Sequence, residues 1–157
     1  LIHLAAGLPF RGGIDVGLGM EIDGYFYGPG LFRAHDLEST KAEFPRVVVG
    51  DTLIDFINNG MSINGSSLED QVNNLFASSS KKLIERDGQN CFFIDQFALE
   101  MATQTEIDQL NELYCKAYAY IKDSISHFEA KSNRKLLDRY RELEKYFRKN
   151  MKIRRLL

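Results

Sequence analysis

The sequence predicts an α+β protein, in which an antiparallel-rich sheet is covered by helices and followed by a C-terminal helical hairpin. Over residues 1–102, short runs rich in β-branched and aromatic residues alternate with helical patterns. Over residues 103–157, apolar residues recur every three or four positions, which is typical of amphipathic helices. The order strand–strand–helix–strand followed by helices indicates a ferredoxin-like arrangement. We expect the second region to pack on the first or to form a dimer contact.

Two strands are predicted near the start of the chain. Residues 10–16 form the first, and residues 20–27, which are rich in aromatic and β-branched side chains, form the second. Gly17 and Gly19 lie between them, as a hairpin or bulge requires. Asp23-Gly24 is interpreted as a turn or a bulge inside the second strand.

A helix, a strand and a second helix are predicted next. Proline at a first helical position favours a helix over residues 29–40. Residues 46–49 are a short hydrophobic run that predicts a central strand. Asp51 or Thr52 is expected to cap a short helix that ends at Ile57.

The middle of the chain predicts a further helix and a hairpin. Ser66 and Glu69 have capping-box spacing, so a helix is expected from there to about Phe76. Residues 78–80, three serines, are predicted to be a flexible stretch. Apolar residues on both sides of Arg86-Asp87-Gly88 predict a β-hairpin.

The last third predicts two long helices. Thr103 and Glu106 form a second capping box, and the apolar pattern behind it extends for about 25 residues. Ser132-Asn133 interrupts the pattern, which resumes with Leu136 and continues to Phe147. Two consecutive amphipathic helices favour an antiparallel pair.

Charge is distributed unevenly along the chain. Residues 1–130 contain 9 Lys and Arg against 19 Asp and Glu, a net charge of −10, whereas residues 131–157 contain 11 against 3, a net charge of +8. The basic end fits a polyanion, or a solvated helix that packs on the acidic remainder or on a partner. Acidic residues are interleaved as far as Glu144, which favours the solvated helix, so nucleic-acid binding is not expected.

The start of the chain and its two cysteines bear on whether the chain is a fragment and on its cellular location. The chain begins with Leu1 inside an apolar segment, so we expect a fragment whose earlier residues are missing; a processed N-terminus is the alternative. No signal peptide and no apolar run of about 20 residues is present, so no membrane span is expected. Cys91 and Cys115 stand apart from other metal-ligand residues and are predicted to be buried thiols of a cytoplasmic protein.

The glycine-rich run over residues 11–19 does not match a known phosphate-binding loop. No Gly-Lys-Ser/Thr follows it, and the dinucleotide fingerprint fails at its third glycine. We therefore expect these glycines to allow a tight turn or a close backbone approach.

Other candidate groups for chemistry give weak signals. Five carboxylates lie close in sequence and are interpreted either as a divalent-metal pair or as solvent-facing residues; they are Asp15, Glu21, Asp23, Asp36 and Glu38. One form of the metal hypothesis has Asp15 and Glu21 facing each other across a hairpin. His3, His35 and His127 are far apart and match no catalytic spacing.

The order of these segments resembles the class III nucleotidyl cyclases. That family has a strand of the type Arg-x-Gly-Ile-x-x-Gly, a helix of the type Gly-x-x-Val-Asn-x-Ala-x-Arg-Leu-Glu, and then a short hydrophobic strand. Residues 11–17, 28–38 and 44–49 match these three segments in order. Bacterial pyrimidine cyclases of Pycsar anti-phage defence are more similar still, since they share a strand like residues 87–95 and a closing helix like residues 135–150.

The resemblance implies a fold and an activity. It identifies residues 1–102 as the C-terminal part of a cyclase-like palm domain. The implied reaction converts a nucleoside triphosphate, CTP or UTP, to a 3′,5′-cyclic monophosphate plus pyrophosphate, in cytoplasmic defence signalling. The family uses two Mg²⁺ or Mn²⁺ ions and builds its site between the two chains of a homodimer.

The resemblance also implies site residues, with departures. The family's base-reading Asp falls on Tyr25, its helix Asn on Phe32 and its helix Arg on Asp36. We expect Tyr25, Tyr27 and Asp36 to contact the nucleotide, and Arg33 to take over the phosphate contact if the helix is rotated. The family's metal-binding aspartates lie in earlier segments of the types "DiLGfs" and "FSDsi", which are expected upstream of this chain.

Three functions stay open at this point. The first is a nucleotidyl cyclase. The second is a catalytically inactive cyclase-like domain that dimerises or senses a nucleotide, which Phe32 and Asp36 favour. The third is a nucleic-acid-binding module that uses the basic end, and it rests on charge alone.

Overall fold

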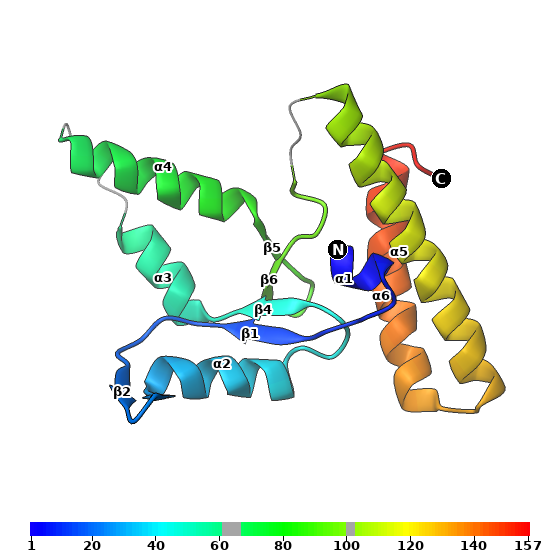
Figure 1. The fold of residues 1–157 in the computed structure, drawn as a ribbon, viewed down its shortest axis with the longest axis horizontal. Helices are drawn as coiled ribbons and strands as arrows, with labels where there is room; N and C mark the ends of the chain where they lie inside the picture. Colours follow the sequence, from blue (N-terminus) through cyan, green and yellow to red (C-terminus); the bar gives the residue numbers. More distant parts are fainter. Residues whose placement is uncertain (61–66, 100–102) are drawn as a thin grey trace. The chain divides into compact units, whose positions relative to one another are not determined.

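The computed structural model describes residues 1–60, 67–99 and 103–157 (Figure 1). The chain divides into two compact units. The sheet unit consists of Arg11–Ala42 and Arg46–Ala98, and the helical unit consists of Leu1–Phe10, Glu43–Pro45 and Leu99–Leu157. The fold is mixed α+β with C-terminal helices, as the sequence predicts.

The main sheet of the described residues has the strand order β1-β4-β6-β5. Its strands are β1 (Gly12–Ile14), β4 (Val47–Val49), β5 (Ile84–Arg86) and β6 (Phe92–Ile94). β1 pairs with β4 in parallel, whereas β6 pairs with both β4 and β5 in antiparallel orientation. The predicted central strand is confirmed, because β4 has a neighbour on each side and its last two valines are buried.

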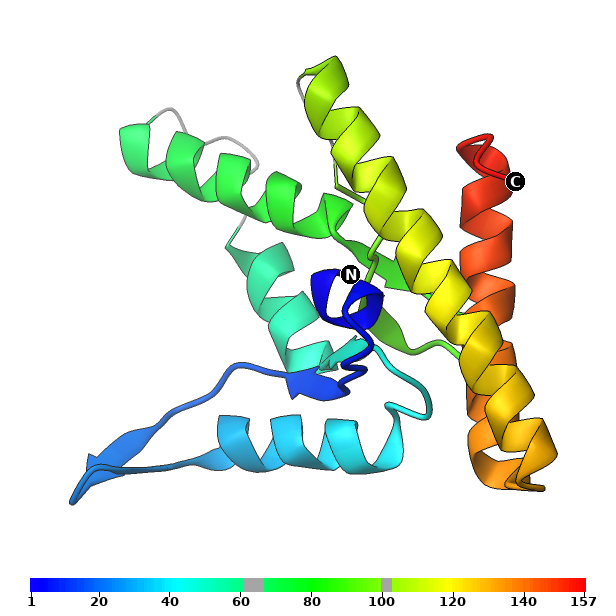
Figure 2. The same cartoon turned by 45° about the vertical axis from the view of Figure 1, so that its right-hand side comes forward.

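The predicted pairing of the first two strands is wrong. β2 (Met20–Ile22) pairs with β3 (Tyr25–Tyr27) to form its own hairpin, which extends beyond the first turn of α2 (Figure 2). Asp23 and Gly24 have φ angles of 54° and 79°. These values match a two-residue turn with both central residues left-handed, so this local turn closes the hairpin within the predicted second strand.

Helix α2 (Pro29–Thr40) lies against β1 at a glycine. A Cβ atom on Gly13 would overlap the carbonyl of Ala34, so only glycine allows the helix to approach the strand this closely. Arg11 and Glu38 join the same two elements by an ion pair of 2.6 Å. The predicted helix over residues 29–40 is confirmed.

Two further helices belong to the sheet unit. α3 (Asp51–Asn59) has Gly50 as its N-cap, so the predicted side-chain cap by Asp51 or Thr52 is wrong. α4 (Leu68–Lys82) is capped by Ser67, whose hydroxyl accepts the backbone N–H of Asp70. Ser66 of the predicted capping box lies outside the described residues.

The three serines at residues 78–80 lie inside α4, so the predicted flexible stretch is wrong. The Ser78 hydroxyl donates to the carbonyl of Leu75, one turn earlier. Lys81 and Lys82 occupy the last turn, where cations interact favourably with the helix dipole. These contacts are compatible with a helix that continues past the low-propensity serines.

The helical unit contains α1 (Ile2–Ala5), α5 (Gln104–Ala130) and α6 (Arg134–Ile153). α5 begins at the predicted capping box, in which Thr103 and Glu106 each bond the other's backbone N–H. Ser132, with φ of 54°, turns the chain between α5 and α6, which run in opposite directions (Figure 2). The predicted antiparallel pair is confirmed.

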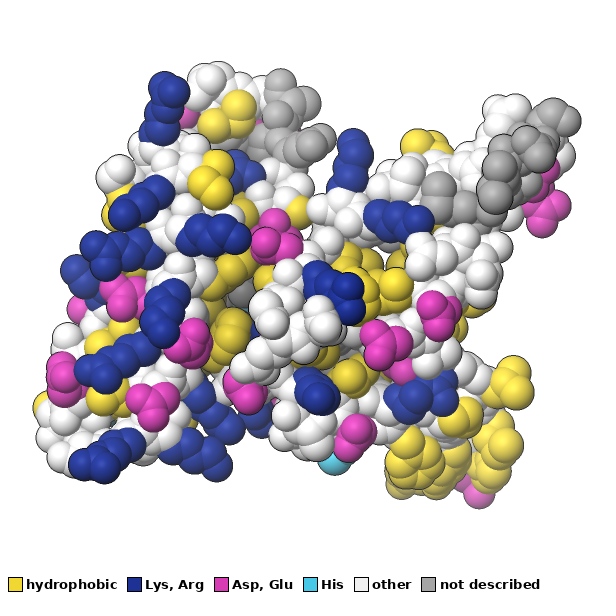
Figure 3. Space-filling model, turned by 180° about the vertical axis from the view of Figure 1, so that it is seen from behind, with side chains coloured by type: hydrophobic (Ala, Val, Ile, Leu, Met, Phe, Trp, Pro, Cys, Tyr) yellow, Lys and Arg dark blue, Asp and Glu magenta, His cyan; other side chains and the backbone are white. Residues whose placement is uncertain are grey.

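One face of α6 is apolar and the opposite face is basic. The buried residues of α6 are Leu137, Tyr140, Leu143, Phe147 and Met151. Exposed cations spaced three, four or seven residues apart form a stripe along the helix, which consists of Arg134, Arg141, Lys145, Arg148 and Lys152 (Figure 3). Two stripe residues have ion pairs with exposed glutamates, Arg141 with Glu129 and Lys145 with Glu142.

The cysteines differ from the prediction. Cys91 is half-buried, but Cys115 is exposed, so the prediction of two buried thiols is wrong for Cys115. Its neighbour Tyr114 takes the buried position of that turn of α5, and the next residue of a helix points about 100° away. Among residues 1–60, 67–99 and 103–157, no helix has the length and apolar character needed to cross a membrane.

A buried ion pair anchors the β5–β6 turn to β4. Arg46, which is buried, donates to the Asp87 carboxylate at 2.7 Å and to the carbonyl of Lys41. Burial alone would raise the pKa of Asp87. The N–H groups of Cys91 and Gln89 and the Arg46 guanidinium outweigh burial and hold that pKa below its ordinary value of 3.8.

Gly13→Ala should lower the free energy of unfolding by about 2 kcal/mol or more, because the added methyl group overlaps the backbone of α2. The neighbouring Gly12→Ala is a matched control, since its Cβ would meet the Val47 side chain at an ordinary 3.6 Å. Urea unfolding followed by circular dichroism measures both. Equal stability of the two variants would contradict the close packing of α2 on Gly13.

Asp87→Asn should lower the free energy of unfolding by about 2 kcal/mol at neutral pH, because it leaves the buried Arg46 without its carboxylate. The native pKa of Asp87 is depressed, so its contribution is present above the unfolded-state value near 4 and is lost as pH falls through the native value. The difference between wild type and variant should therefore shrink below about pH 4. Urea unfolding at several pH values tests this, and Asp55→Asn gives the effect of removing an exposed carboxylate.

Candidate functional site

The C-terminal end of β1 meets α2 and α3 at the carboxylate of Asp15. The Asp15 side chain is only 2% exposed. Its Oδ2 accepts from Nε of Arg33 at 2.7 Å. Its Oδ1 accepts from the backbone N–H groups of Val16 and Leu53, at 2.9 and 3.0 Å. One buried side chain therefore connects three segments that are distant in sequence.

Asp15 serves as the N-cap group that α3 lacks in its own sequence. Gly50, the N-cap residue, has no side chain, and Leu53 lies in the first turn of the helix. The Asp15 carboxylate fills this position, where an anion also interacts favourably with the helix dipole. A Cβ on Gly50 would lie 2.5 Å from Cγ of Asp15, so glycine makes room for the carboxylate.

Arg33 extends from α2 to the end of β1. Besides the Asp15 pair, its Nη2 donates to the carbonyl of Val16 at 2.5 Å. The Arg33 side chain as a whole is 41% exposed. The predicted phosphate-binding residue therefore occupies a position that is both structural and accessible.

The glycine-rich run passes over the first turn of α2. A Cβ on Gly17 would lie 2.8 Å from the backbone nitrogen of Gly30, and one on Gly28 would overlap the carbonyl of Leu18. The backbones of the two segments are thus in direct contact. The prediction that these glycines allow a close backbone approach is confirmed.

The other predicted nucleotide contacts lie on β3 and α2. Tyr25 and Tyr27, which are 68% and 47% exposed, are two residues apart on β3 and so lie on the same face of the hairpin. Asp36 lies on α2, one turn after Arg33, and is exposed; its backbone carbonyl accepts from Ser39 and Thr40. The structure joins Arg33 to Asp15, and Asp36 lies outside this cluster.

Of the two interpretations of the carboxylates, the Asp15–Glu21 pair across a hairpin does not form, and a solvent-facing position is wrong for Asp15. Glu21 pairs with Phe26 in the β2–β3 hairpin, whereas Asp15 is buried beside Arg33. In the described part of the chain, no group of three or more His, Cys, Asp or Glu side chains is arranged to hold a metal ion.

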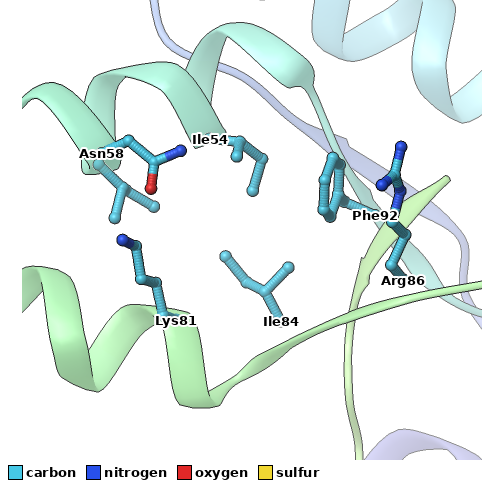
Figure 4. Close-up of a pocket in the computed structure, with 7 residues that line it drawn as sticks. Ile54, Asn58, Lys81, Ile84, Arg86 and Phe92 are labelled. Atoms are coloured by element: carbon cyan, nitrogen blue, oxygen red, sulfur yellow. The ribbon is translucent and has the colours of Figure 1, made fainter. Parts of the chain in front are cut away.

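A pocket of about 310 Å³ lies between α3, the end of α4 and the β5–β6 hairpin (Figure 4). Its lining residues are Ile54, Ile57, Asn58, Lys81, Ile84, Arg86 and Phe92. This pocket was not predicted from the sequence. The available signal was the spacing of residues 54, 57 and 58, which share one helix face, together with the alternation of residues 84 and 86 on a strand.

The chain matches no family model, no curated protein and no solved structure.

Asp15→Ala should lower the free energy of unfolding by about 2–3 kcal/mol, because it removes the α3 cap and leaves Arg33 without its carboxylate. The loss is smaller than for a fully buried ion pair, because the Arg33 side chain is partly solvated. Asp15→Asn should cost less, because the amide oxygen still accepts from Leu53. Chemical unfolding measures these effects, with the exposed Glu21→Ala as control; equal stability of Asp15→Ala and the control would contradict the role of Asp15.

Proposed function

We propose that this chain is the C-terminal part of a nucleotidyl cyclase domain. The proposed reaction converts CTP or UTP to the 3′,5′-cyclic monophosphate and pyrophosphate, in cytoplasmic anti-phage signalling. The ribose 3′-oxygen attacks the α-phosphorus, and the bond from that phosphorus to the oxygen of the leaving pyrophosphate breaks. The proposal rests on the resemblance to class III cyclases, in particular to the Pycsar pyrimidine cyclases.

The observation that most supports this proposal is the way the matching segments pack. Arg11 and Glu38 are the first residue of the strand motif and the last residue of the helix motif, and they form an ion pair of 2.6 Å. Gly13 and Gly17, the glycines of the strand motif, both lie so close to α2 that an added Cβ atom would overlap its backbone. These motif residues therefore all contribute to the packing of α2 against β1.

The residues of this chain are proposed to bind the nucleotide. Tyr25 and Tyr27 present two aromatic rings on one face of β3, a surface on which a base can stack. The guanidinium of the partly exposed Arg33 side chain is proposed to contact a phosphate, in competition with Asp15. The resemblance assigns the two Mg²⁺ or Mn²⁺ ions to aspartates of preceding strands, and no step proposed for these residues passes through the metal.

A homodimer is part of the proposal, and the hairpin supports it. Large apolar side chains gather over the β2–β3 hairpin and its flanks (Figure 3). Monomeric proteins rarely expose a large contiguous apolar patch, so this surface favours an interface. The exposed residues are Leu18, Met20, Ile22, Tyr25, Phe26, Tyr27, Leu31 and Phe32. A second copy of the chain is the proposed partner for this patch.

An inactive cyclase-like domain that dimerises or senses a nucleotide is the second candidate. Phe32 stands where the family has Asn, and it is 71% exposed on α2. Asp36 stands where the family has Arg, so the position that normally neutralises phosphate charge is acidic. Both residues favour binding without turnover.

The full-length protein with Mn²⁺ and each of the four ribonucleoside triphosphates tests the proposal, with products identified by mass spectrometry and mass in solution by sedimentation. We expect cyclic CMP or cyclic UMP plus pyrophosphate from a dimer. Arg33→Ala should lower turnover by about tenfold or more, because one charged phosphate contact is lost. Arg148→Ala, a change of the same type on α6, should leave turnover unchanged.

The outcomes separate the two candidates. Nucleotide binding by a folded dimer without any cyclic product would replace the cyclase with the nucleotide sensor. Full activity of Arg33→Ala would remove Arg33 from the proposed site. Because Arg33 also contacts Asp15, the unfolding midpoint of each variant is measured alongside its activity.

A further inference from the structure

The pocket between α3, α4 and the β5–β6 hairpin combines two apolar sides with polar groups at its ends (Figure 4). Ile54 and Ile57 contribute one side from α3, and Ile84 and Phe92 contribute the facing side from β5 and β6. Its volume of about 310 Å³ is at the lower end of the range of small-molecule sites. A compact ligand with an apolar body of one or two rings fits this space.

The polar groups of the pocket are cations and an amide. Lys81, from the last turn of α4, and Asn58, from the last turn of α3, lie at the same end of the pocket (Figure 4). Arg86 lies at the other end, with its guanidinium 5.1 Å from the centre of the Phe92 ring. No lining residue is acidic among those that form the pocket in the described structure, so the lining favours an anion.

The strand geometry keeps the nearest acidic residue of β5 out of the pocket. Glu85 lies between Ile84 and Arg86, and successive side chains of a strand point to opposite faces. Glu85 is paired in register with Phe93, whereas Arg86 is paired with Phe92 of the pocket. The sheet therefore presents its cation and its aromatic ring to the pocket and its carboxylate to the other face.

We propose that this pocket binds a small organic anion that has a flat apolar body and one carboxylate or phosphate group. The apolar body lies between Ile54 and Ile84, against Phe92. The anionic group lies at the end formed by Lys81 and Asn58, where the ammonium donates to it and the Asn58 amide N–H₂ supplies a second donor. This site lies outside the residues assigned to nucleotide turnover, and it does not depend on the cyclase proposal.

A series of ligands with one apolar body and different charges tests the site. The probes are 1-naphthoate, 1-naphthyl phosphate, the neutral 1-naphthamide and the cationic 1-naphthylmethylamine, each titrated into the full chain and followed by the backbone amide NMR signals. We expect the anions to bind about tenfold more tightly than the amide, with shifts centred on residues 54–58, 81–86 and 92. The stronger of the two anions identifies the natural ligand as a carboxylate or as a phosphate ester.

Lys81→Met measures how much the charge of Lys81 contributes to anion binding, and Lys82→Met is the matched control. Lys82 is the next residue of α4 and does not line the pocket. Lys81→Met should weaken naphthoate binding by about fivefold to tenfold and leave naphthamide binding unchanged, since only the charged contact is removed. Lys82→Met should leave both unchanged.

Three results would overturn the proposal. They are equal affinity for anion and amide, shifts centred on the β2–β3 hairpin instead of the pocket, and naphthoate binding by Lys81→Met at the wild-type affinity. Both lysines are exposed, so the two variants should fold, and their amide spectra report this directly.

Discussion

The buried carboxylate of Asp15 is the interaction on which the arrangement of the sheet unit depends. It accepts hydrogen bonds from the first turn of α3, from its own neighbour Val16 and from Arg33 on α2. A buried charge is costly unless it is paired and fully hydrogen-bonded, and these three donors meet that requirement. The Asp15 carboxylate therefore fixes the positions of both α2 and α3 relative to the end of β1. Gly50 and Gly17 support this junction, because side chains at these positions would occupy the space of Asp15 and Arg33.

The proposed activity and the proposed anion pocket use different chemistry within one unit. Near α2, exposed aromatic rings offer a surface on which a base can stack. The guanidinium of Arg33 already binds the Asp15 carboxylate, so a phosphate would compete with Asp15 for it. In the pocket, aliphatic walls surround a ring and two cations. The first arrangement suits a large polar ligand on an open surface, and the second suits a compact amphipathic one.

Local signals predicted much of the fold, and long-range contacts account for what they missed. The helix over residues 29–40, the Thr103–Glu106 capping box and the β5–β6 hairpin follow from proline, capping and turn chemistry within a few residues. The partner of β1 is β4, more than 30 residues away, and no local signal reveals it. The same holds for the site: the sequence singled out Arg33, but its partner Asp15 was considered as a possible metal ligand. Only the fold brings the two side chains together.

The basic stripe of α6 makes the stability of this helix depend on its packing against α5. Cations three and four residues apart, such as Arg141, Lys145 and Arg148, repel one another on a helix surface. In an isolated segment this repulsion would lower the helix content, and the Glu142–Lys145 ion pair within α6 offsets part of it. The apolar face that packs against α5 supplies the missing stability. Packing against α5 stabilises α6 through its apolar face. The opposite face of α6 can therefore carry closely spaced positive charges while the segment stays helical.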